Sequence, residues 1–378
     1  ASYGVSLLIT GAGVSISEIP GRLADNLRST LCLELADVYQ YGDALRTAQP
    51  PVRPEAGVHG RGLIRQDGRI LEFQTALALP AADMYERGRQ IEEQCRIMHA
   101  GWTGRCARPV PIIPAKPKWN DLLQREEMPA LLAGNRYLPI GYEYATAGIY
   151  SLDLRHTFCY VVSGRARSGK TNTLKLLMRA AYAKKMRLSV LEPKGVDLQG
   201  ECEQLGADRF STLEELVNFI WELGRTFQER NAVKMSMVAD GVEEDAQFER
   251  MSREQPWLVV ISDLTAFVNL ATSDEATRMN VGKSMTNLFN VGFLHNIYFA
   301  AAFNQDERGQ VMGKDLYEAF VKDRDGIHLG GNAANQQLFE FAGMPFSQQS
   351  QPEKPGVGLV PPRDGEPYRK VILPLAKG

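Results

Sequence analysis

The residues best suited to chemistry form an eight-residue run near the middle of the chain. Residues 164–171 read Gly-Arg-Ala-Arg-Ser-Gly-Lys-Thr and fit the P-loop pattern G-x-x-x-x-G-K-[ST]. Gly164 and Gly169 let the backbone bend so that successive N–H groups point into one concavity, which suits a polyphosphate. Lys170 would place an ammonium group on the β- and γ-phosphates of ATP, and the Thr171 hydroxyl would ligate Mg²⁺.

The segments around this run supply the context that a P-loop requires. Phe158–Ser163 is apolar and β-branched, as a buried strand should be. After the loop, apolar residues recur at helical spacing through Lys185, and the positive end of that helix would face the same anion. This order of strand, loop and helix argues against a chance glycine-rich turn. The predicted nucleotide-binding residues are Gly164, Arg165, Ala166, Arg167, Ser168, Gly169, Lys170, Thr171 and Asn172.

A second candidate segment is the apolar run Trp257–Ile261, which is followed by Ser262 and Asp263. In a Walker B site two acids follow such a strand: the first holds the magnesium water shell and the second polarises the attacking water. If Ser262 takes the first place, Asp263 takes the second. A shift by one residue makes Asp263 the metal ligand and leaves no general base. Either way one carboxylate is missing, which binding tolerates better than hydrolysis. The alternative role for Asp263 is a helix N-cap.

Asn304 and His328 are polar residues that end or interrupt apolar runs. Asn304 closes the predicted strand Asn296–Asn304, where its amide would sense the γ-phosphate or orient water; the alternative is a loop amide that closes a turn. His328 lies inside the apolar run Gly326–Asn332, and we expect a core or interface histidine there. The predicted catalytic residues are Asp263, Ser262 and Asn304, and the predicted metal ligands are Thr171 and Asp263.

Composition narrows the class of protein. The 378 residues predict two or three domains, and 44% hydrophobic with 23% charged residues is ordinary for a globular chain. A net charge of −2 without a dense basic tract gives no support to a general nucleic-acid-binding surface. The five cysteines form no C-x-x-C pair, so we expect buried or free thiols in a reducing compartment. No signal peptide or membrane-length apolar run is evident, and we expect any membrane anchor to lie outside this sequence.

The first part of the chain predicts a small set of elements without a P-loop of their own. Val5–Thr10 is predicted to be a buried strand and Leu31–Leu35 another, with a short amphipathic helix around Arg22–Arg28 between them. Gly60–Gln74 is predicted to be a hairpin, because Gln-Asp-Gly provides its turn.

The middle of the chain contains the best domain boundary. Ala81–His99 carries many charges and apolar residues at roughly helical spacing, which predicts a surface helix. Ala107–Pro117 is proline-dense and indicates an extended linker; an SH3-type ligand is the less favoured alternative. Leu138–Tyr142 and Gly148–Asp153 are predicted to form a hairpin that leads into the P-loop strand.

After the P-loop, strand and helix patterns alternate, as in a doubly wound sheet. Arg187–Leu191 predicts a second parallel strand, and Leu213–Arg230 predicts a strong amphipathic helix. Met235–Arg253 is polar and irregular, which indicates a loop or a loosely held helix. Met279–Phe293 is predicted to be another helix.

Two segments near the end of the chain echo segments near its start. Gly356–Leu373 repeats the Gly-x-Gly-Leu-[Ile/Val] and Asp-Gly pattern of Gly60–Phe73, and Ile297–Phe303 resembles Val5–Thr10. The chain is therefore predicted to contain the tail of one P-loop module and the whole of a second.

Four segments together resemble the SpoIIIE/FtsK class of hexameric motor ATPases: the P-loop Gly164–Thr171, the turn Glu192–Gly195 and the strands Trp257–Leu264 and Asn296–Asn304. The motifs that point more narrowly are Leu138–Gly141, Gly330–Asn332 and the hairpin Gly60–Gln74. They resemble the EssC/EccC ATPase of type VII secretion, which carries tandem modules of this class on one membrane-anchored chain.

The resemblance implies an α/β fold: a RecA-like P-loop NTPase core with a mostly parallel central sheet and flanking hairpins. It implies the end of one module in residues 1–78, a helix and proline-rich linker in 79–118, and a complete module in 119–378. The implied ligands are ATP and Mg²⁺. The implied partners are small Esx (WXG-type) proteins bound through a C-terminal signal, and other ATPase modules of the same chain. The resemblance also implies assembly into a hexamer and a location at the cytoplasmic face of the cell membrane.

Three functional hypotheses remain open from the sequence. The first is a motor module of a secretion ATPase whose hydrolysis is slow or depends on assembly, with Arg253 and Arg324 as arginine-finger candidates. The second is a DNA translocase of the same superfamily, which would show salt-sensitive DNA binding. The third is an ATP-locked adaptor without turnover, which would dock an amphipathic peptide helix in an apolar groove.

Overall fold

The computed structural model describes residues 8–11, 29–48, 52–105, 111–363 and 365–377. The chain divides into two compact units, Ala1–Arg108 and Pro109–Gly378. The division falls inside the proline-dense segment 107–117. Each unit is described by itself.

The first unit contains a three-stranded antiparallel sheet in the order β1 (Leu31–Cys32), β2 (Arg61–Gln66), β3 (Arg69–Gln74). The predicted hairpin is confirmed, with its turn at Asp67 and Gly68 at positive φ. Helix α2 (Val38–Leu45) begins at the N-cap Asp37 and packs Tyr41 and Leu45 against the sheet. Helix α3 (Met84–Ala100) confirms the predicted surface helix, since none of its residues is buried.

Two expectations for the first unit need correction. Of the strand predicted for Val5–Thr10, residues 5–7 lie outside the described residues, and Leu8–Thr10 is exposed and pairs with none of the described strands. The strand predicted for Leu31–Leu35 is only two residues long, because only Leu31 and Cys32 pair with β2. The helix predicted around Arg22–Arg28 lies outside the described residues.

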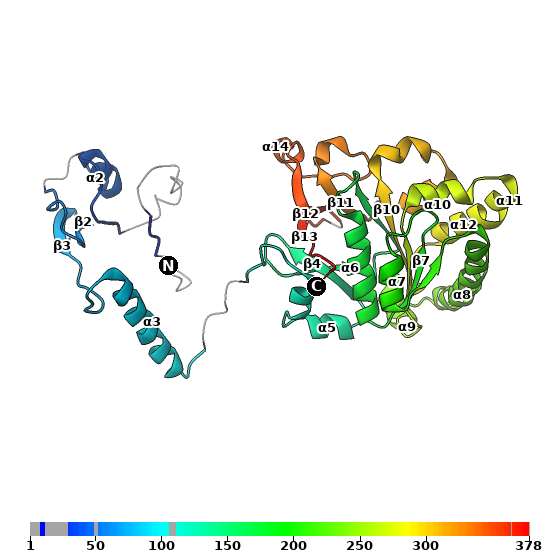
Figure 1. The fold of residues 1–378 in the computed structure, drawn as a ribbon, viewed down its shortest axis with the longest axis horizontal. Helices are drawn as coiled ribbons and strands as arrows, with labels where there is room; N and C mark the ends of the chain where they lie inside the picture. Colours follow the sequence, from blue (N-terminus) through cyan, green and yellow to red (C-terminus); the bar gives the residue numbers. More distant parts are fainter. Residues whose placement is uncertain (1–7, 12–28, 49–51, 106–110, 364, 378) are drawn as a thin grey trace. The chain divides into compact units, whose positions relative to one another are not determined.

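The second unit is built on one ten-stranded sheet in the order β5-β4-β13-β12-β11-β6-β10-β9-β7-β8 (Figure 1). Six neighbouring strands, from β11 to β8, run parallel, and the remaining four extend the sheet as antiparallel hairpins. The strands are β4 (Tyr137–Glu143), β5 (Ile149–Asp153), β6 (Cys159–Gly164), β7 (Arg187–Leu191), β8 (Asp208–Phe210), β9 (Trp257–Ile261), β10 (Ile297–Asn304), β11 (Gly326–Gly331), β12 (Glu353–Val360) and β13 (Arg369–Ile372). The predicted α/β architecture with a mostly parallel core and flanking hairpins is confirmed.

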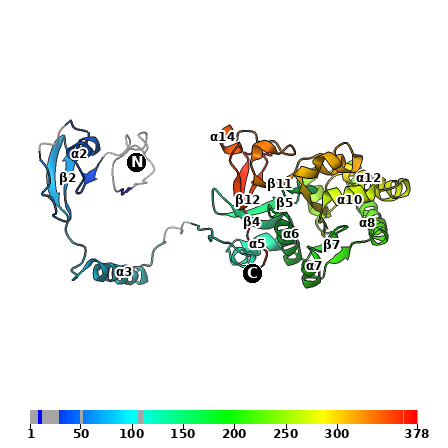
Figure 2. The same ribbon diagram turned by 45° about the horizontal axis from the view of Figure 1, so that its top comes forward.

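Helices cover both faces of this sheet. Side chains along a strand alternate between the two faces, and here both sets are apolar and must be buried. In β9, Trp257 and Val259 belong to one hydrophobic cluster and Leu258 and Val260 to the other. The first face packs against α8 (Leu213–Ala239), α10 (Leu264–Ala271), α12 (Lys283–Val291) and α13 (Asp315–Val321). The second packs against α4 (Trp119–Leu123), α5 (Met128–Ala133), α6 (Lys170–Ala183) and α7 (Gln199–Leu205), and α6 and α7 lie side by side (Figures 1 and 2).

The segment Met235–Arg253 is more regular than its sequence indicates. Helix α8 continues to Ala239, and α9 (Glu244–Met251) follows it. Tertiary contacts explain the difference: Lys234 donates a hydrogen bond to the Phe293 carbonyl at 2.8 Å, and Phe248 and Met251 are buried. The predicted helix over Met279–Phe293 is also modified, because it opens with a π-helical turn, Arg278–Gly282.

Short helical segments complete the second unit. They are α11 (Glu275–Thr277), the 3-10 helices Gln305–Gln310 and Ala333–Asn335, and α14 (Phe346–Gln349). The last residues return to the beginning of the unit, where Leu375 accepts a hydrogen bond from the Trp119 amide at 2.9 Å and donates one to the Pro117 carbonyl at 2.8 Å.

Candidate functional site

The P-loop joins the carboxyl end of β6 to the first turn of α6. Its backbone takes the left-handed conformation at Arg167 (φ 61°) and Gly169 (φ 103°), which turns the chain sharply before the helix begins at Lys170. Gly164 has no room for a side chain, because a Cβ there would collide with the Leu329 carbonyl and the Ser168 hydroxyl. The strand that precedes the loop is fully buried. Strand, loop and helix therefore have the arrangement that the motif requires.

Lys170 is held across the loop. Its ammonium group donates hydrogen bonds to the carbonyl oxygens of Gly164 at 3.0 Å and Arg165 at 2.6 Å. Burial lowers the pKa of Lys170, while the nearby carboxylates of Glu307 and Asp263 act in the opposite direction. A polyphosphate placed against the loop would give this cation new partners.

A cleft of about 290 Å³ lies beside the loop, at the carboxyl edge of the parallel strands. It brings together five residues that the sequence singles out: Lys170, Thr171, Ser262, Asp263 and Asn304. The cleft is also lined by Lys194, Asp197 and Glu307, none of which was predicted from the sequence as a site residue. Their only signal is position, since each follows a predicted strand by a few residues.

Ser262 and Asp263 lie at the end of β9. The backbone N–H of Ser262 donates to the Leu191 carbonyl at 2.9 Å, so the hydrogen-bond ladder continues through this residue and Asp263 is the first residue beyond it. Asp263 also caps α10, because its Oδ1 accepts a hydrogen bond from the Ala266 N–H at 3.0 Å. The Ser262 hydroxyl is buried and has no hydrogen-bond partner among the described residues. Both roles considered for Asp263, N-cap and site residue, are thus compatible with its position.

Asn304 ends β10 and opens the 3-10 helix Gln305–Gln310. Its carboxamide oxygen accepts a hydrogen bond from the Asp306 N–H at 3.3 Å, and its nitrogen donates to Glu307 Oε1 at 3.1 Å. Asn304 therefore closes a turn, as one of the two sequence interpretations holds, and it also faces the cleft.

Asn172 uses its side chain for the fold. Its carboxamide donates to the Pro374 carbonyl and accepts from the Ala376 N–H, both at 2.9 Å. A contact between Asn172 and a nucleotide would therefore come from its backbone. Among the other loop residues, Arg165 is exposed, with its guanidinium 3.7 Å from the Asp306 carboxylate.

The turn that carries Lys194 is fixed by a buried acid. Glu192 directly follows β7, accepts a hydrogen bond from the Leu198 N–H at 2.9 Å and pairs with Arg209 at 2.6 Å. Its side chain is fully buried in this pair, so Glu192 holds the loop in place and does not face the cleft.

The cleft has the donors that a magnesium–nucleotide complex needs. Mg²⁺ keeps several waters and uses few protein ligands, chiefly carboxylates and phosphate oxygens. The Thr171 and Ser262 hydroxyls and the Asp263 carboxylate lie in the same cleft as the Lys170 ammonium. Among the described residues, no group of three or more His, Cys, Asp or Glu side chains forms a ready metal site. The arrangement suits a metal that arrives with its phosphates.

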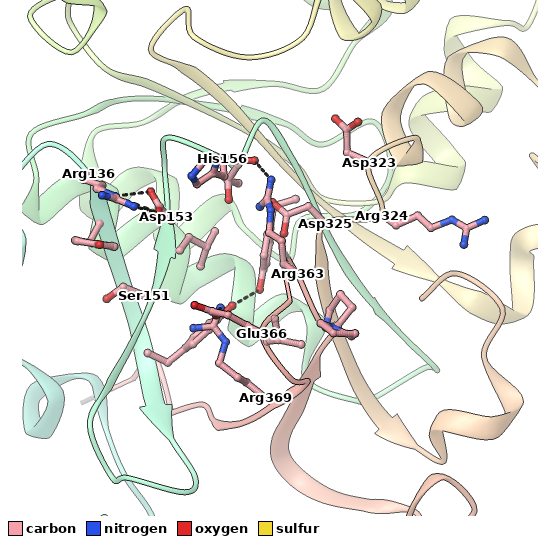
Figure 3. Close-up of a pocket in the computed structure, with 18 residues that line it drawn as sticks. Arg136, Ser151, Asp153, His156, Asp323, Arg324, Asp325, Arg363, Glu366 and Arg369 are labelled. Carbon is pink, nitrogen blue, oxygen red and sulfur yellow. Dashed lines mark hydrogen bonds and ion pairs between the residues drawn. The ribbon is translucent and has the colours of Figure 1, made fainter. Parts of the chain in front are cut away.

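A second pocket, of about 440 Å³, opens at the opposite edge of the sheet, where β6 begins (Figure 3). Its charges are largely satisfied: Arg136 pairs with Asp153 at 2.7 Å, and Arg363 with Asp325 at 3.4 Å. Arg324, an arginine-finger candidate, points away from the pocket and pairs with Glu340. This pocket shares no residue with the cleft beside the P-loop.

His328 is a core residue, as expected. It is 1% exposed on β11, and burial lowers its pKa to about 4. It does not line the cleft.

Solved ATPase domains of EssC and EccC superpose on the chain. ATPases 2 and 3 of EssC from Geobacillus thermodenitrificans superpose with a TM-score of 0.65 at 19% identity, over 96% of this chain and 64% of that one. The fold is that of an α/β P-loop ATPase. ATPases 2 and 3 of Thermomonospora curvata EccC, solved with a signal sequence peptide, give a TM-score of 0.53 at 17% identity, over 96% of this chain and 61% of that one.

A conjugation protein shares the fold less closely. The pCW3 coupling protein TcpA, solved with ATPγS, gives a TM-score of 0.50 at 16% identity, over 70% of this chain and 71% of that one. The chain spans less than two thirds of the EssC and EccC structures above. No family model matches the chain, and a search of curated proteins finds no match. In the described part of the chain, no helix combines the length and apolar character that crossing a bilayer requires.

Proposed function

We propose that this chain is an ATP-binding motor module of a type VII secretion ATPase. The observation that carries the proposal is the cleft that joins the P-loop residues Lys170 and Thr171 to Ser262 and Asp263 at the carboxyl edge of the parallel sheet. Lys170 would bind the β- and γ-phosphates, and the loop amides would surround them. Thr171 would ligate Mg²⁺, with Asp263 beside it.

The secretion role is supported by the fold shared with EssC and EccC. The EccC structure holds a signal sequence peptide. We extend this to a proposed cargo of small Esx-type proteins that carry a C-terminal signal. A location at the cytoplasmic face of a membrane, assembly into a hexamer and contacts with other ATPase modules of the same chain belong to the same proposal.

The proposed module boundaries rest on a repeated strand arrangement. In the first unit β1, β2 and β3 are neighbours in that order, and in the second unit β11, β12 and β13 are. Gly62 and Leu63 pair with Phe73 and Glu72, as Gly358 and Leu359 pair with Val371 and Lys370. We propose that residues 1–78 are the end of one ATPase module, 79–118 a helix and linker, and 119–378 a complete module.

A DNA translocase is the second candidate, because the conjugation protein TcpA shares the fold. The net charge of −2 disfavours it, since a duplex-binding channel needs many cations. Binding to a fluorescent duplex that weakens steeply with salt would favour this candidate over the secretion role.

A thermal melt with and without Mg-ATP tests the nucleotide site. Ligand at about 100 times its Kd stabilises the folded state by about 2.7 kcal/mol, which is a shift of several degrees for a domain of this size. We expect the wild type to shift and Lys170→Ala not to shift, with equal melting temperatures in the absence of nucleotide. Equal shifts in both proteins, or none in the wild type, would contradict the proposal.

A further inference from the structure

The cleft contains a carboxylate that the Walker B comparison does not account for. Ser262 leaves that motif with one acid, Asp263, and one oxygen of Asp263 is already engaged by the Ala266 N–H. Attack by water on the γ-phosphate needs a group that orients the water and accepts its proton. Glu307 lines the same cleft as Lys170 and Asp263.

The fold carries Glu307 to the phosphate side of the cleft. It lies three residues beyond β10, and β10 lies between the P-loop strand β6 and the strand β9 that precedes Ser262. The register pairs Asn304 with Gly164, so β10 ends level with the first residue of the P-loop. The Asn304 carboxamide then fixes the Glu307 carboxylate by a hydrogen bond of 3.1 Å.

Electrostatics identifies the same residue. Of the carboxylates that raise the pKa of Lys170, Glu307 has the largest effect, ahead of Asp263 and Asp306. Glu307 is thus the acid with the strongest electrostatic effect on the ammonium group that would bind the β- and γ-phosphates, and it lines the same cleft.

The other acids near the loop have different surroundings. Glu192 is buried in its pair with Arg209, and Asp306 is exposed and faces Arg165. Asp197 lines the cleft but belongs to the loop after β7, which is separated from β6 by β9 and β10.

We infer that Glu307 is the general base of this site, in place of the acid that the Ser262–Asp263 pair lacks. In the step it serves, the oxygen of a water molecule forms a bond to the γ-phosphorus and the bond from that phosphorus to the β,γ-bridging oxygen breaks. ADP leaves with the bridging oxygen, and the water proton passes to a carboxylate oxygen of Glu307 and then to solvent. The inference rests on the proposed ATP site and names a further catalytic residue in it.

The test separates binding from turnover in Glu307→Gln. Glutamine keeps an oxygen that can accept the Asn304 hydrogen bond, but it cannot take a proton. We expect the Mg-ATP affinity, measured by calorimetry, to stay within about threefold of the wild type, because the base acts in the transition state. We expect kcat for phosphate release to fall by roughly 10²- to 10⁴-fold. Glu249→Gln, which changes an exposed acid on α9, is the matched control and should leave both values unchanged.

Three results would overturn the inference. The first is a kcat of Glu307→Gln that lies within about tenfold of the wild-type value. The second is a loss of affinity that matches the loss of kcat, which would assign Glu307 to metal binding. The third is phosphate release by the wild type no faster than by Lys170→Ala. In this last case a Mg-ATP binding signal in the wild type shows that the proposed site stands while the base does not, and its absence shows that both fail.

Discussion

Gly164 lies between two parts of the chain that leave no space for a side chain. A Cβ at this position would meet the Leu329 carbonyl on the neighbouring strand and the Ser168 hydroxyl within the loop. We expect Gly164→Ala to displace the loop, to cost about 1–3 kcal/mol of stability and to weaken Mg-ATP binding at least roughly tenfold. Urea unfolding and calorimetry measure the two effects.

Gly200 provides the matched control for that substitution. It lies in the exposed first turn of α7, where an added Cβ meets nothing within 4 Å. Gly200→Ala should be neutral or stabilising by up to about 1 kcal/mol, with unchanged ATP binding. A Gly164→Ala protein that behaves like this control would contradict the steric argument.

Two buried histidines make stability depend on pH. Burial lowers the pKa values of His295 and His328 to about 4, below their ordinary value of 6.5. The unfolded chain therefore binds more protons between these two values, so stability is complete above pH 6.5 and falls as the pH is lowered toward 4. We expect a loss of about 1.4 kcal/mol per pH unit for each histidine within this window. Urea unfolding between about pH 6.5 and pH 5 measures the slope, and His328→Gln should remove about half of it; an unchanged slope would contradict the assignment.

At the residue scale, the sequence predicted the P-loop because its chemistry depends on contiguous residues. Lys170 and Thr171 can be located from their spacing alone. Glu307 could not, because it reaches the cleft only through the pairing of β10 with β6 and through the hydrogen bond to Asn304. Asn172 is the reverse case. Its position beside Thr171 predicts a contact with the nucleotide, but its carboxamide is hydrogen-bonded to Pro374 and Ala376.

At the element scale, helix α10 and the proposed nucleotide site share Asp263. Its carboxylate caps the helix at 3.0 Å and lines the cleft. Asp263→Asn keeps a side-chain oxygen for the cap and removes the charge, so stability should stay within a few tenths of a kcal/mol while the Mg²⁺ dependence of ATP binding weakens. Asp263→Ala should show the same binding defect and also lose about 1 kcal/mol. Unfolding curves and ATP titrations with and without Mg²⁺ distinguish the two roles. If ATP binding keeps its full Mg²⁺ dependence in both variants, Asp263 acts only as the helix N-cap.

Helices and strands were predictable where the apolar residues recur regularly, and less predictable where tertiary contacts determine the local structure. The buried strands β6, β7, β9 and β10 follow from short apolar runs. Helix α8 extends nine residues beyond the predicted Arg230 to Ala239 because contacts such as the Lys234–Phe293 hydrogen bond support a polar stretch that propensity alone leaves open. Leu8 and Ile9 have strand propensity but are exposed, because no described strand pairs with them.

At the scale of the whole molecule, the proposed nucleotide site lies in the second unit. Every residue of the cleft beside the P-loop falls within Pro109–Gly378. We expect a fragment of residues 109–378 to fold cooperatively and to show the same Mg-ATP thermal shift as the full chain. Differential scanning calorimetry on both proteins measures this. A fragment that unfolds gradually, or folds without the nucleotide shift, would show that the first unit is needed.

The last residues of the chain join two places that are far apart in sequence. The backbone N–H of Leu375 donates to the Pro117 carbonyl, and its carbonyl accepts from the Trp119 N–H, where the linker enters the second unit. Its neighbours Pro374 and Ala376 are bonded to Asn172, one residue after Thr171. Residues 374–376 therefore join the point where the linker enters the second unit to the first turn of the P-loop helix. A displacement of the chain at Pro117 would reach the proposed nucleotide site through these hydrogen bonds.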